Sequence, residues 1–207
     1  MPEKNINSTT MLPAALRPTP DESGMTVPQL LEHRINALFE QIPLVAELGE
    51  AFAQAGHDLY LVGGSVRDAL MGRLGHDLDF TTDARPDDTE AILRQHTHAT
   101  WDIGRAFGTI GAQIDDWVVE VTTYRADAYH PDSRKPEIVY GETLKDDLIR
   151  RDFTVNAMAL HAATRTFSDP YAGLTDIVSG ILRTPFPPER SFSDDPLRMM
   201  RAARFTS

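Results

Sequence analysis

Paired carboxylates on a predicted strand are the first residues in this sequence that could do chemistry. Asp77, Leu78, Asp79 and Phe80 alternate in polarity with a period of two, so a strand here projects both acids from one face. Two neighbouring carboxylates repel each other unless a cation lies between them. Mg²⁺ takes oxygen ligands and usually shares them with substrate phosphates. The pair predicts a magnesium site, and a solvated strand face is the alternative.

A glycine pair precedes these acids. The apolar run 59–62 predicts a short strand that stops at Gly63 and Gly64, and Ser65 opens a predicted helix. Glycines lack the Cβ atoms that keep a backbone from closing around an anion, and a helix start offers unpaired N–H groups. We predict that Gly63, Gly64 and Arg67 hold a triphosphate. A plain turn, with Arg67 in a surface ion pair, is the alternative; a Walker loop is excluded because no Gly-Lys-Ser/Thr follows.

These motifs resemble those of a known superfamily. Gly64-Ser65 followed by Asp77-x-Asp79 looks like the signature of the DNA polymerase β nucleotidyltransferases, and LVGGSVRD…DLDFTT resembles the bacterial class II CCA-adding enzymes and poly(A) polymerases. Two further segments are similar to this family: DDLIRRDFTVNAMAL at 146–160 and DDPLRMMRAARF at 194–205. The resemblance runs from residue 59 to the C-terminus and does not include residues 1–25.

The resemblance implies roles for the first of these segments. Arg151 would contact phosphate, since its planar fork donates two hydrogen bonds and its charge survives at any pH. Asp152 and Asn156 would lie near the ribose hydroxyls. A plain salt bridge between Arg151 and Asp152 is the structural alternative.

The second segment predicts a capped helix. By resemblance, Asp195 and Arg198 select the base: a carboxylate accepts from the exocyclic amine that cytosine and adenine share, and an arginine donates to the ring. Arg201 and Arg204 are assigned to the nucleotide or template frame. An amphipathic helix with a solvated arginine face is the alternative. The family usually has Glu where this chain has the shorter Asp194.

A third carboxylate is predicted on a neighbouring strand. The pattern indicates strands near 99–103, 109–114 and 117–123, with Asp115-Asp116 as a hairpin turn between the last two. On the last strand Glu120 shares a face with two small or apolar residues and could be a third acid aimed at the metals. A solvated glutamate is the alternative.

The remaining segments predict an α+β fold with a mixed, largely antiparallel nucleotidyltransferase sheet flanked by helices. Helices are indicated from Thr26, with a capping box, and over 43–55, from 85–90 and over 143–150. Residues 125–140 predict a long loop, which the resemblance links with the switch from C to A addition; a connector is the alternative. We expect a disordered tail over 1–25, a head domain over 26–165 and the start of a helical neck domain over 166–207.

Composition limits the other possibilities. The 207 residues are 41% hydrophobic and include no cysteine, which excludes disulfides and thiolate zinc sites. There is neither an 18-residue apolar run nor a secretory leader, so we expect a cytoplasmic protein without a membrane partner. The net charge of −11 opposes nucleic-acid binding, but residues 146–207 balance eight arginines against eight acids. The main RNA-gripping surface is therefore expected further along a longer chain.

The expected function is CCA addition by a tRNA nucleotidyltransferase. With Mg²⁺ bound at Asp77 and Asp79, and Glu120 beside them, it would join CMP and AMP from CTP and ATP to the 3′ end of tRNA and release pyrophosphate. A poly(A) polymerase using ATP alone is one alternative. A catalytic-head fragment, which binds nucleotide but is inactive on tRNA, is the other, because the sequence stops inside an apparent helix at 205–207.

Overall fold

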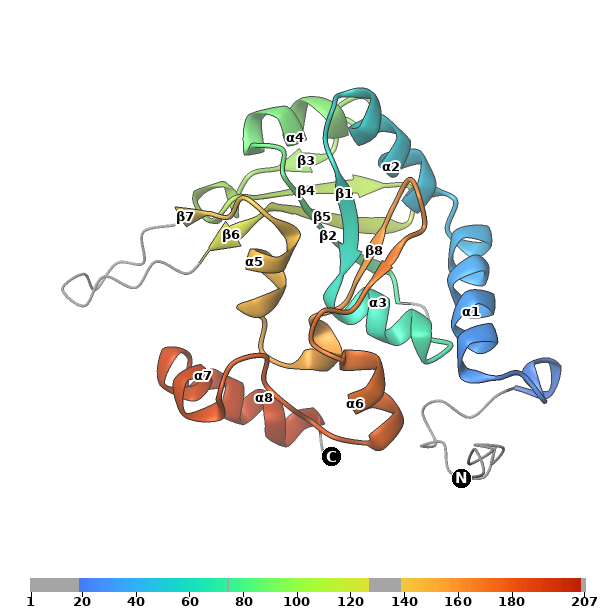
Figure 1. Cartoon of the computed structure of the whole chain (residues 1–207). Coiled ribbons are helices and arrows are strands. Elements are labelled where there is room, and N and C mark those ends of the chain that lie inside the picture. The colour runs from blue at the N-terminus through green and yellow to red at the C-terminus, as the bar shows by residue number, and fades with distance from the viewer. Residues whose placement is uncertain (1–18, 74, 127–138, 206–207) are drawn as a thin grey trace, which may run out of the picture.

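The computed structural model describes residues 19–73, 75–126 and 139–205, and among these seven strands form one sheet (Figure 1). In sheet order the strands are β3 (Thr100–Trp101), β4 (Thr109–Ile114), β5 (Trp117–Thr123), β2 (Asp77–Thr82), β1 (Leu59–Val62), β8 (Ala159–His161) and β9 (Phe167–Ser168). The helices are η3 (Pro20–Glu22), α1 (Val27–Gln41), α2 (Leu44–Gln54), α3 (Gly63–Leu70), α4 (Pro86–Leu93), η4 (Arg105–Phe107), α5 (Leu144–Ile149), η5 (Thr154–Asn156), α6 (Gly173–Ser179), α7 (Pro188–Asp194) and α8 (Leu197–Phe205). β2 and β5 run parallel and the other neighbours are antiparallel, which confirms the predicted fold class.

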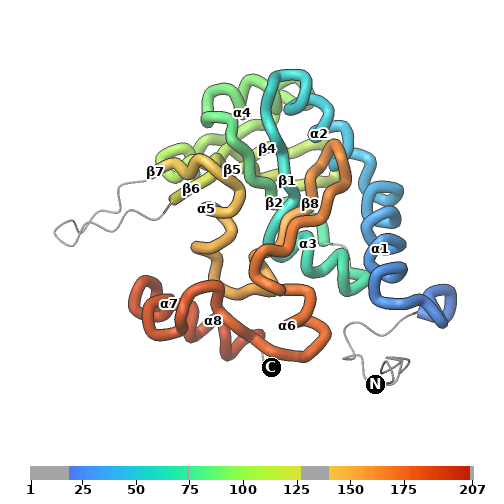
Figure 2. Tube along the Cα trace, viewed as in Figure 1, coloured from blue at the N-terminus to red at the C-terminus, as the bar shows by residue number. Residues whose placement is uncertain are grey.

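One face of the sheet carries the hydrophobic core. Leu61, Phe80, Val121 and Ile110 occupy one row across β1, β2, β5 and β4, and each is at most 1% exposed. α2 and α4 cover this face, while α1 runs beside α3 (Figures 1 and 2). The alternation of β2 thus places its apolar side chains in the core, where each contributes roughly 1.5–3 kcal/mol, and leaves its carboxylates on the other side.

Among the described residues, only part of the opposite face is covered. α5 packs over β1 and β8, where Leu148, Val62 and Ala159 form a small buried cluster. Along β2 and β5 on this face, Asp79 and Glu120 stay exposed. α7 and α8 lie on the far side of α5 from α2 and α4 (Figure 1). Asp79 and Glu120 therefore line an open cleft together with residues that follow α5 and residues of the C-terminal helices.

Local sequence signals account for most element boundaries. The Thr26 N–H donates to Gln29 Oε1 (2.9 Å), as the predicted capping box requires, and α1 follows it. β4 and β5 have the predicted bounds, with Asp115 at φ 50° in the turn between them. Two elements differ from expectation. β3 is shorter than predicted, and α3 begins at Gly63, so the glycines form its first turn.

The predicted start of order at Thr26 is wrong. Thr19 opens a second capping box in which its N–H donates to Glu22 Oε2 (2.8 Å). Glu22 is 5% exposed because it forms an ion pair with Arg34 on α1. Arg34 also donates to the carbonyl of Leu70 at the end of α3 (2.6 Å). The ordered region thus extends to residue 19, and the rest of the predicted tail lies outside the described residues.

Short paired strands lie at the predicted domain boundary and at both ends of the predicted 125–140 loop. The predicted boundary at 165 falls between β8 and β9, which pair with each other, so the sheet continues to Ser168. Within the predicted 125–140 loop, Arg125–Ala126 (β6) and Val139–Tyr140 (β7) pair as a short ribbon. Residues 127–138, on which most of that prediction falls, lie outside the described part of the chain. In that described part, no helix is long and apolar enough to cross a bilayer.

Glu22→Gln tests whether the Glu22–Arg34 pair secures the N-terminal segment. The hydrogen bond from Arg34 lowers the pKa of Glu22 to about 2, so its stabilisation is complete above the ordinary value of 4.5 and is lost as the pH falls through 2. Because the substitution leaves Arg34 buried without a carboxylate, the free energy of unfolding at pH 7 should fall by about 3–5 kcal/mol in urea titrations. Asp21→Asn, at an exposed neighbour, is the control. Equal stability of wild type and Glu22→Gln at pH 7 would show that the pair contributes nothing.

Candidate active site

The predicted metal-binding acids lie together on the open face of the sheet. Asp79 is registered with Glu120 across the parallel β2–β5 pair, and Asp77 lies two residues earlier on the same face. Ser65 in α3 holds this strand: its hydroxyl donates to the Asp77 carbonyl and accepts from the Asp79 N–H, both at 3.2 Å. The sequence predicted only that Ser65 begins the helix. Its contact with β2 joins residues 12 and 14 positions apart, so no local pattern indicates it.

Burial and the charges of neighbouring carboxylates disfavour the charged forms of Asp79 and Glu120. Part of Asp79 is open to solvent, but its carboxylate lies in a cleft, and this burial raises its pKa. The positive charge of Arg151 lowers that pKa, and the negative charge of Asp77 raises it further. Burial and the two aspartates likewise raise the pKa of Glu120. A cation bound beside Asp77 and Asp79 would relieve this repulsion.

The donor set fits magnesium better than a metal enclosed by protein ligands. Across the described ranges, no three His, Cys, Asp or Glu side chains are grouped closely enough to hold an ion by themselves. An ion at Asp77 and Asp79 therefore needs further oxygen ligands. Mg²⁺ commonly takes them from water and from substrate phosphates.

Gly63 lies between the acids and an arginine. Its φ is +68°, and an added Cβ would lie 3.1 Å from Arg151 Nη1 and 3.9 Å from Asp79 Oδ2. A side chain here would be strained and would push on Arg151. At Gly64 the nearest atom to an added Cβ is Arg67 Nη2, at 3.5 Å, so that position is less demanding. The first turn of α3 thus lies against both a carboxylate and a guanidinium group.

A buried carboxylate that the sequence analysis missed fixes this arginine. Asp147 in α5 is fully buried and accepts from Arg150 (2.7 Å) and Arg151 (2.9 Å). Burial would raise the pKa of Asp147, but the two guanidinium groups outweigh it and hold that pKa below its usual range. The spacing i, i+3 and i, i+4 on the predicted helix was the available signal. Arg151 thus pairs with Asp147, and not with Asp152 as the structural alternative had it.

Arg151 keeps a donor for a ligand. Its Nε is buried and has no hydrogen-bond partner among the residues described. A buried N–H without an acceptor is costly, so such a donor at a cleft suits an anionic guest. This fits the predicted phosphate contact.

Four of the predicted nucleotide-binding residues form one hydrogen-bonded chain. Arg201 donates to Asp152 (2.7 Å), Asn156 donates to the other oxygen of Asp152 (2.9 Å), and Arg67 donates to Asn156 (2.6 Å). Arg67 also pairs with Asp68, lies over the ring of Phe205, and is absent from the cleft lining. It links α3, η5 and α8, and its contact with triphosphate stays a prediction.

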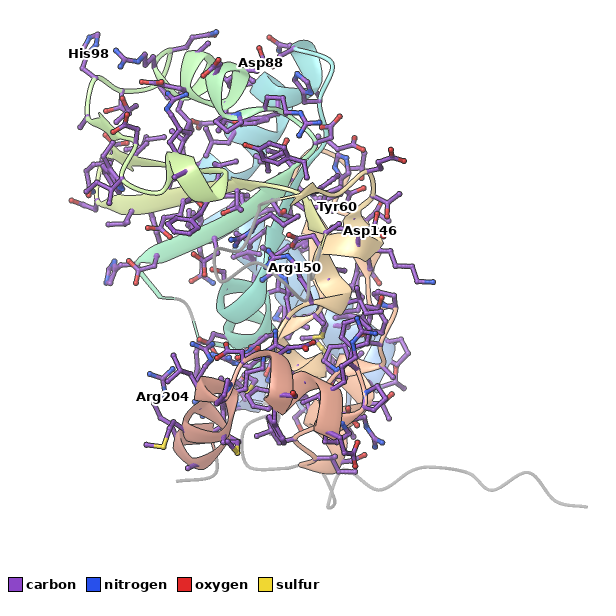
Figure 3. The ribbon with its side chains drawn as sticks, turned by 90° about the vertical axis from the view of Figure 1, so that its left-hand side faces the viewer. Tyr60, Asp88, His98, Asp146, Arg150 and Arg204 are labelled. Carbon is purple, nitrogen blue, oxygen red and sulfur yellow. The ribbon has the colours of Figure 1, made fainter. Side chains whose placement is uncertain are left out.

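Asp79, Glu120 and several arginines line an open cleft of about 400 Å³, whereas Asp77 is not part of its lining. The predicted site residues in its lining come from β2, β5, the segment after α5 and the C-terminal helices: Asp79, Glu120, Arg151, Asp152, Asp195, Arg198 and Arg201. Arg125 and Arg150, which were not predicted, also line it. In Figure 3, Arg150 lies between the sheet and the C-terminal helices, whereas Arg204 lies at the outer side of those helices and is absent from the lining.

The C-terminal helix presents a fixed acid–arginine pair. One oxygen of Asp195 accepts from the Leu197 N–H (3.0 Å), as a helix cap does, and the other lies 3.8 Å from Arg198 Nε. Arg198 donates to Ser191 (2.7 Å) and to the Arg150 carbonyl (2.6 Å). Asp194 lies on α7 at 3.7 Å from Arg190. The orientation of Arg198 therefore rests on α5 and α7 as well as on its own helix.

Known proteins share this sequence and this arrangement. The family model described as the poly(A) polymerase head domain matches residues 59–183. The CCA-adding enzyme of Bacillus subtilis is 43% identical over 155 residues, which are 74% of this chain and 38% of that enzyme. The chain thus spans well under half the length of this relative.

Solved structures agree with the sequence match. The Bacillus stearothermophilus CCA-adding enzyme in complex with CTP is similar with a TM-score of 0.70 and 37% identity, over 80% of this chain and 39% of that one. The Thermotoga maritima CCA-adding enzyme complexed with tRNA is similar with a TM-score of 0.66 and 26% identity, over 87% and 40%. The resemblance drawn from the glycine, aspartate and arginine motifs is confirmed, and the chain belongs to the poly(A) polymerase head-domain family.

Proposed function

We propose that this chain is the nucleotide-binding and catalytic part of an enzyme that adds CMP and AMP, from CTP and ATP, to the 3′ end of tRNA. The observation that carries the proposal is the single cleft in which β2 and β5 present carboxylates opposite Arg151 and the Asp195–Arg198 pair. The CTP and tRNA bound by the two structural relatives support these substrates. Because tRNA and both nucleotides are cytoplasmic, we place the activity there.

The chemistry proposed for the cleft is phosphoryl transfer. The 3′-hydroxyl oxygen of the acceptor attacks the α-phosphorus of the nucleotide, the bond to the bridging oxygen breaks, and pyrophosphate leaves. Magnesium at Asp77 and Asp79 would supply Lewis-acid stabilisation of the phosphate oxygens when bound. Arg151, fixed by Asp147, is oriented to offset charge on the phosphates. Glu120 lies beside Asp79 on the same face, where it can accept the proton of the attacking hydroxyl.

Base choice is proposed to reside in α8. One oxygen of Asp195 caps the helix, and the other can accept from an exocyclic amine, which cytosine and adenine carry. Arg198 donates on the same edge, and its bonds to Ser191 and the Arg150 carbonyl fix its direction. Uracil and guanine present a carbonyl where the amine is required, so they would face a carboxylate without a donor. The same pocket serves both nucleotides, as CCA addition requires.

The first prediction concerns the metal-binding acids. Asp79→Asn should abolish CMP incorporation into tRNA lacking its 3′ CCA, measured with Mg²⁺ and labelled CTP. Because the pKa of Asp79 is raised by burial, the folded chain binds its proton more tightly than the unfolded chain, so ionisation lowers stability as pH rises through the raised value. The variant should therefore melt at or above the wild-type temperature at pH 7 without metal. Loss of folding would make Asp79 structural instead.

The same assay separates the competing functions. Incorporation of CMP followed by AMP supports CCA addition, and incorporation from ATP alone onto unrelated RNA supports poly(A) synthesis. Nucleotide binding without incorporation means that the activity needs protein beyond this chain.

The pH dependence of incorporation is a further test. The raised pKa values of Asp79 and Glu120 favour their protonated forms, so wild-type incorporation should be lost on acidification at a higher pH than it would be with carboxylates of ordinary pKa.

The second prediction concerns Asp147. Asp147→Asn removes the charge that holds Arg150 and Arg151, so the maximal incorporation rate should fall by about 10- to 100-fold as Arg151 loses its orientation. The thermal melt should also fall, since the guanidinium groups stay partly buried without a carboxylate. Asp146→Asn changes the adjacent residue, whose carboxylate faces the helix cap, and is the matched control. Equal kinetics for both variants would contradict the role of Asp147.

The third prediction concerns base selection. Asp195→Asn keeps an oxygen for the helix cap but presents an amide, which can donate to the carbonyl of uracil. Discrimination of CTP over UTP, measured as a ratio of kcat/KM values, should fall by about 10- to 100-fold. Glu189→Gln, on the exposed start of α7, is the charge-matched control. Unchanged discrimination in Asp195→Asn would exclude this residue from base choice.

A further inference from the structure

One row of residues crosses the open face of the sheet from the acids to its edge. Asp79 on β2 is registered with Glu120 on β5, Glu120 with Gly111 on β4, and Gly111 with Trp101 on β3. Registered partners project from the same face of a sheet. Trp101 therefore shares the face of the carboxylates, whereas the other tryptophan, Trp117, packs against the core on the opposite face.

The indole of Trp101 occupies the place that a side chain at Gly111 would take. An added Cβ at Gly111 would lie 2.1 Å from Trp101 Nε1 and 2.6 Å from Cζ2, so the ring covers this glycine. Gly111 is buried as a result, while Trp101 is only half-buried. The ring thus rests on the sheet next to Glu120 and keeps part of its surface open to solvent.

The position of the ring is opposite the groups that hold the nucleotide. Gly63, Arg151 and Arg198 lie on the side of Asp79 toward β1, α5 and α8, whereas Trp101 lies on the side toward the β3 edge. In an in-line displacement the attacking hydroxyl approaches from the side away from the leaving pyrophosphate. The acceptor strand therefore enters over β5 and β4.

We propose that the Trp101 indole is a stacking platform for a base at the 3′ end of the acceptor RNA. Gly111 lies one strand spacing, about 5 Å, from Glu120, which is on the scale of one or two stacked bases at about 3.4 Å each. The platform holds the terminal bases while the 3′-hydroxyl reaches the acids. Stacking on an aromatic ring tolerates any base, as suits a 3′ end whose last nucleotide changes as it grows. This inference rests on the proposed function.

The two tryptophans allow a direct test by fluorescence. Trp117→Phe leaves Trp101 as the sole tryptophan, and a single-stranded RNA ending in CC should quench its emission on binding. Trp101→Phe leaves Trp117, whose emission should stay unchanged with the same RNA. An RNA with an abasic 3′ nucleotide should lose most of the quenching. Failure of the Trp117→Phe chain to bind the RNA, or binding with unchanged emission, overturns the proposal.

Affinity measurements separate stacking from a structural role of the ring. Trp101→Leu should weaken binding of the RNA by about 5- to 100-fold, and Trp101→Phe should restore a large part of it. CTP binding with Mg²⁺ should match wild type in both variants, and both should remain folded at the assay temperature. Loss of CTP binding in wild type would reject the proposed function, whereas intact CTP binding with RNA affinity equal in Trp101→Leu and wild type would reject only the platform. Quenching of Trp101 by CTP and not by RNA would assign the ring to the nucleotide and overturn the inference.

Discussion

The Asp147 carboxylate is the contact on which the geometry of the cleft depends. It is fully buried in α5 and pairs with two consecutive arginines. Arg151 is thereby directed at the first turn of α3, where only a glycine with positive φ leaves room for it. The carbonyl of Arg150 accepts from Arg198, so α8 is attached to the same point. A single buried ion triad thus fixes Arg151 and the start of α8 relative to each other.

The arginines and the carboxylates of the cleft affect the stability of the folded chain in opposite ways. Arg150 and Arg151 are both paired with Asp147 within the protein, and breaking such a buried set costs several kcal/mol. On β2 and β5, burial raises the pKa of Asp79 and of Glu120, and the charge of Asp77 adds to both shifts, so a bound cation would stabilise their charged forms. The protein therefore stabilises its cationic half internally and leaves its anionic half to be completed by ligands. Carboxylates with pKa values raised in this way are expected at a site that binds metal and triphosphate.

Sequence reasoning succeeded where the signal is local and periodic. The alternation of β2 placed Asp77 and Asp79 on one face, the hairpin at Asp115 had its predicted register, and the capping box at Thr26 started α1. It failed where partners are distant in the chain. Nothing near Arg67 indicates that Asn156 and Phe205 engage it, and nothing near Glu22 indicates that Arg34 buries it. Asp147 is intermediate, because its spacing to the arginines was visible but its burial depends on the sheet beneath α5.

The period of two in β2 has a consequence for how this part of the protein can vary in length. Inserting or deleting one residue within Asp77–Thr82 would turn the strand over, sending the carboxylates into the core and Leu78 and Phe80 into the cleft. The pairings with β1 and β5 on either side prevent a compensating shift. The strand itself can tolerate substitutions but must keep its length. Insertions and deletions should therefore be confined to the connection between α3 and β2. Related sequences that differ in length would carry their gaps there.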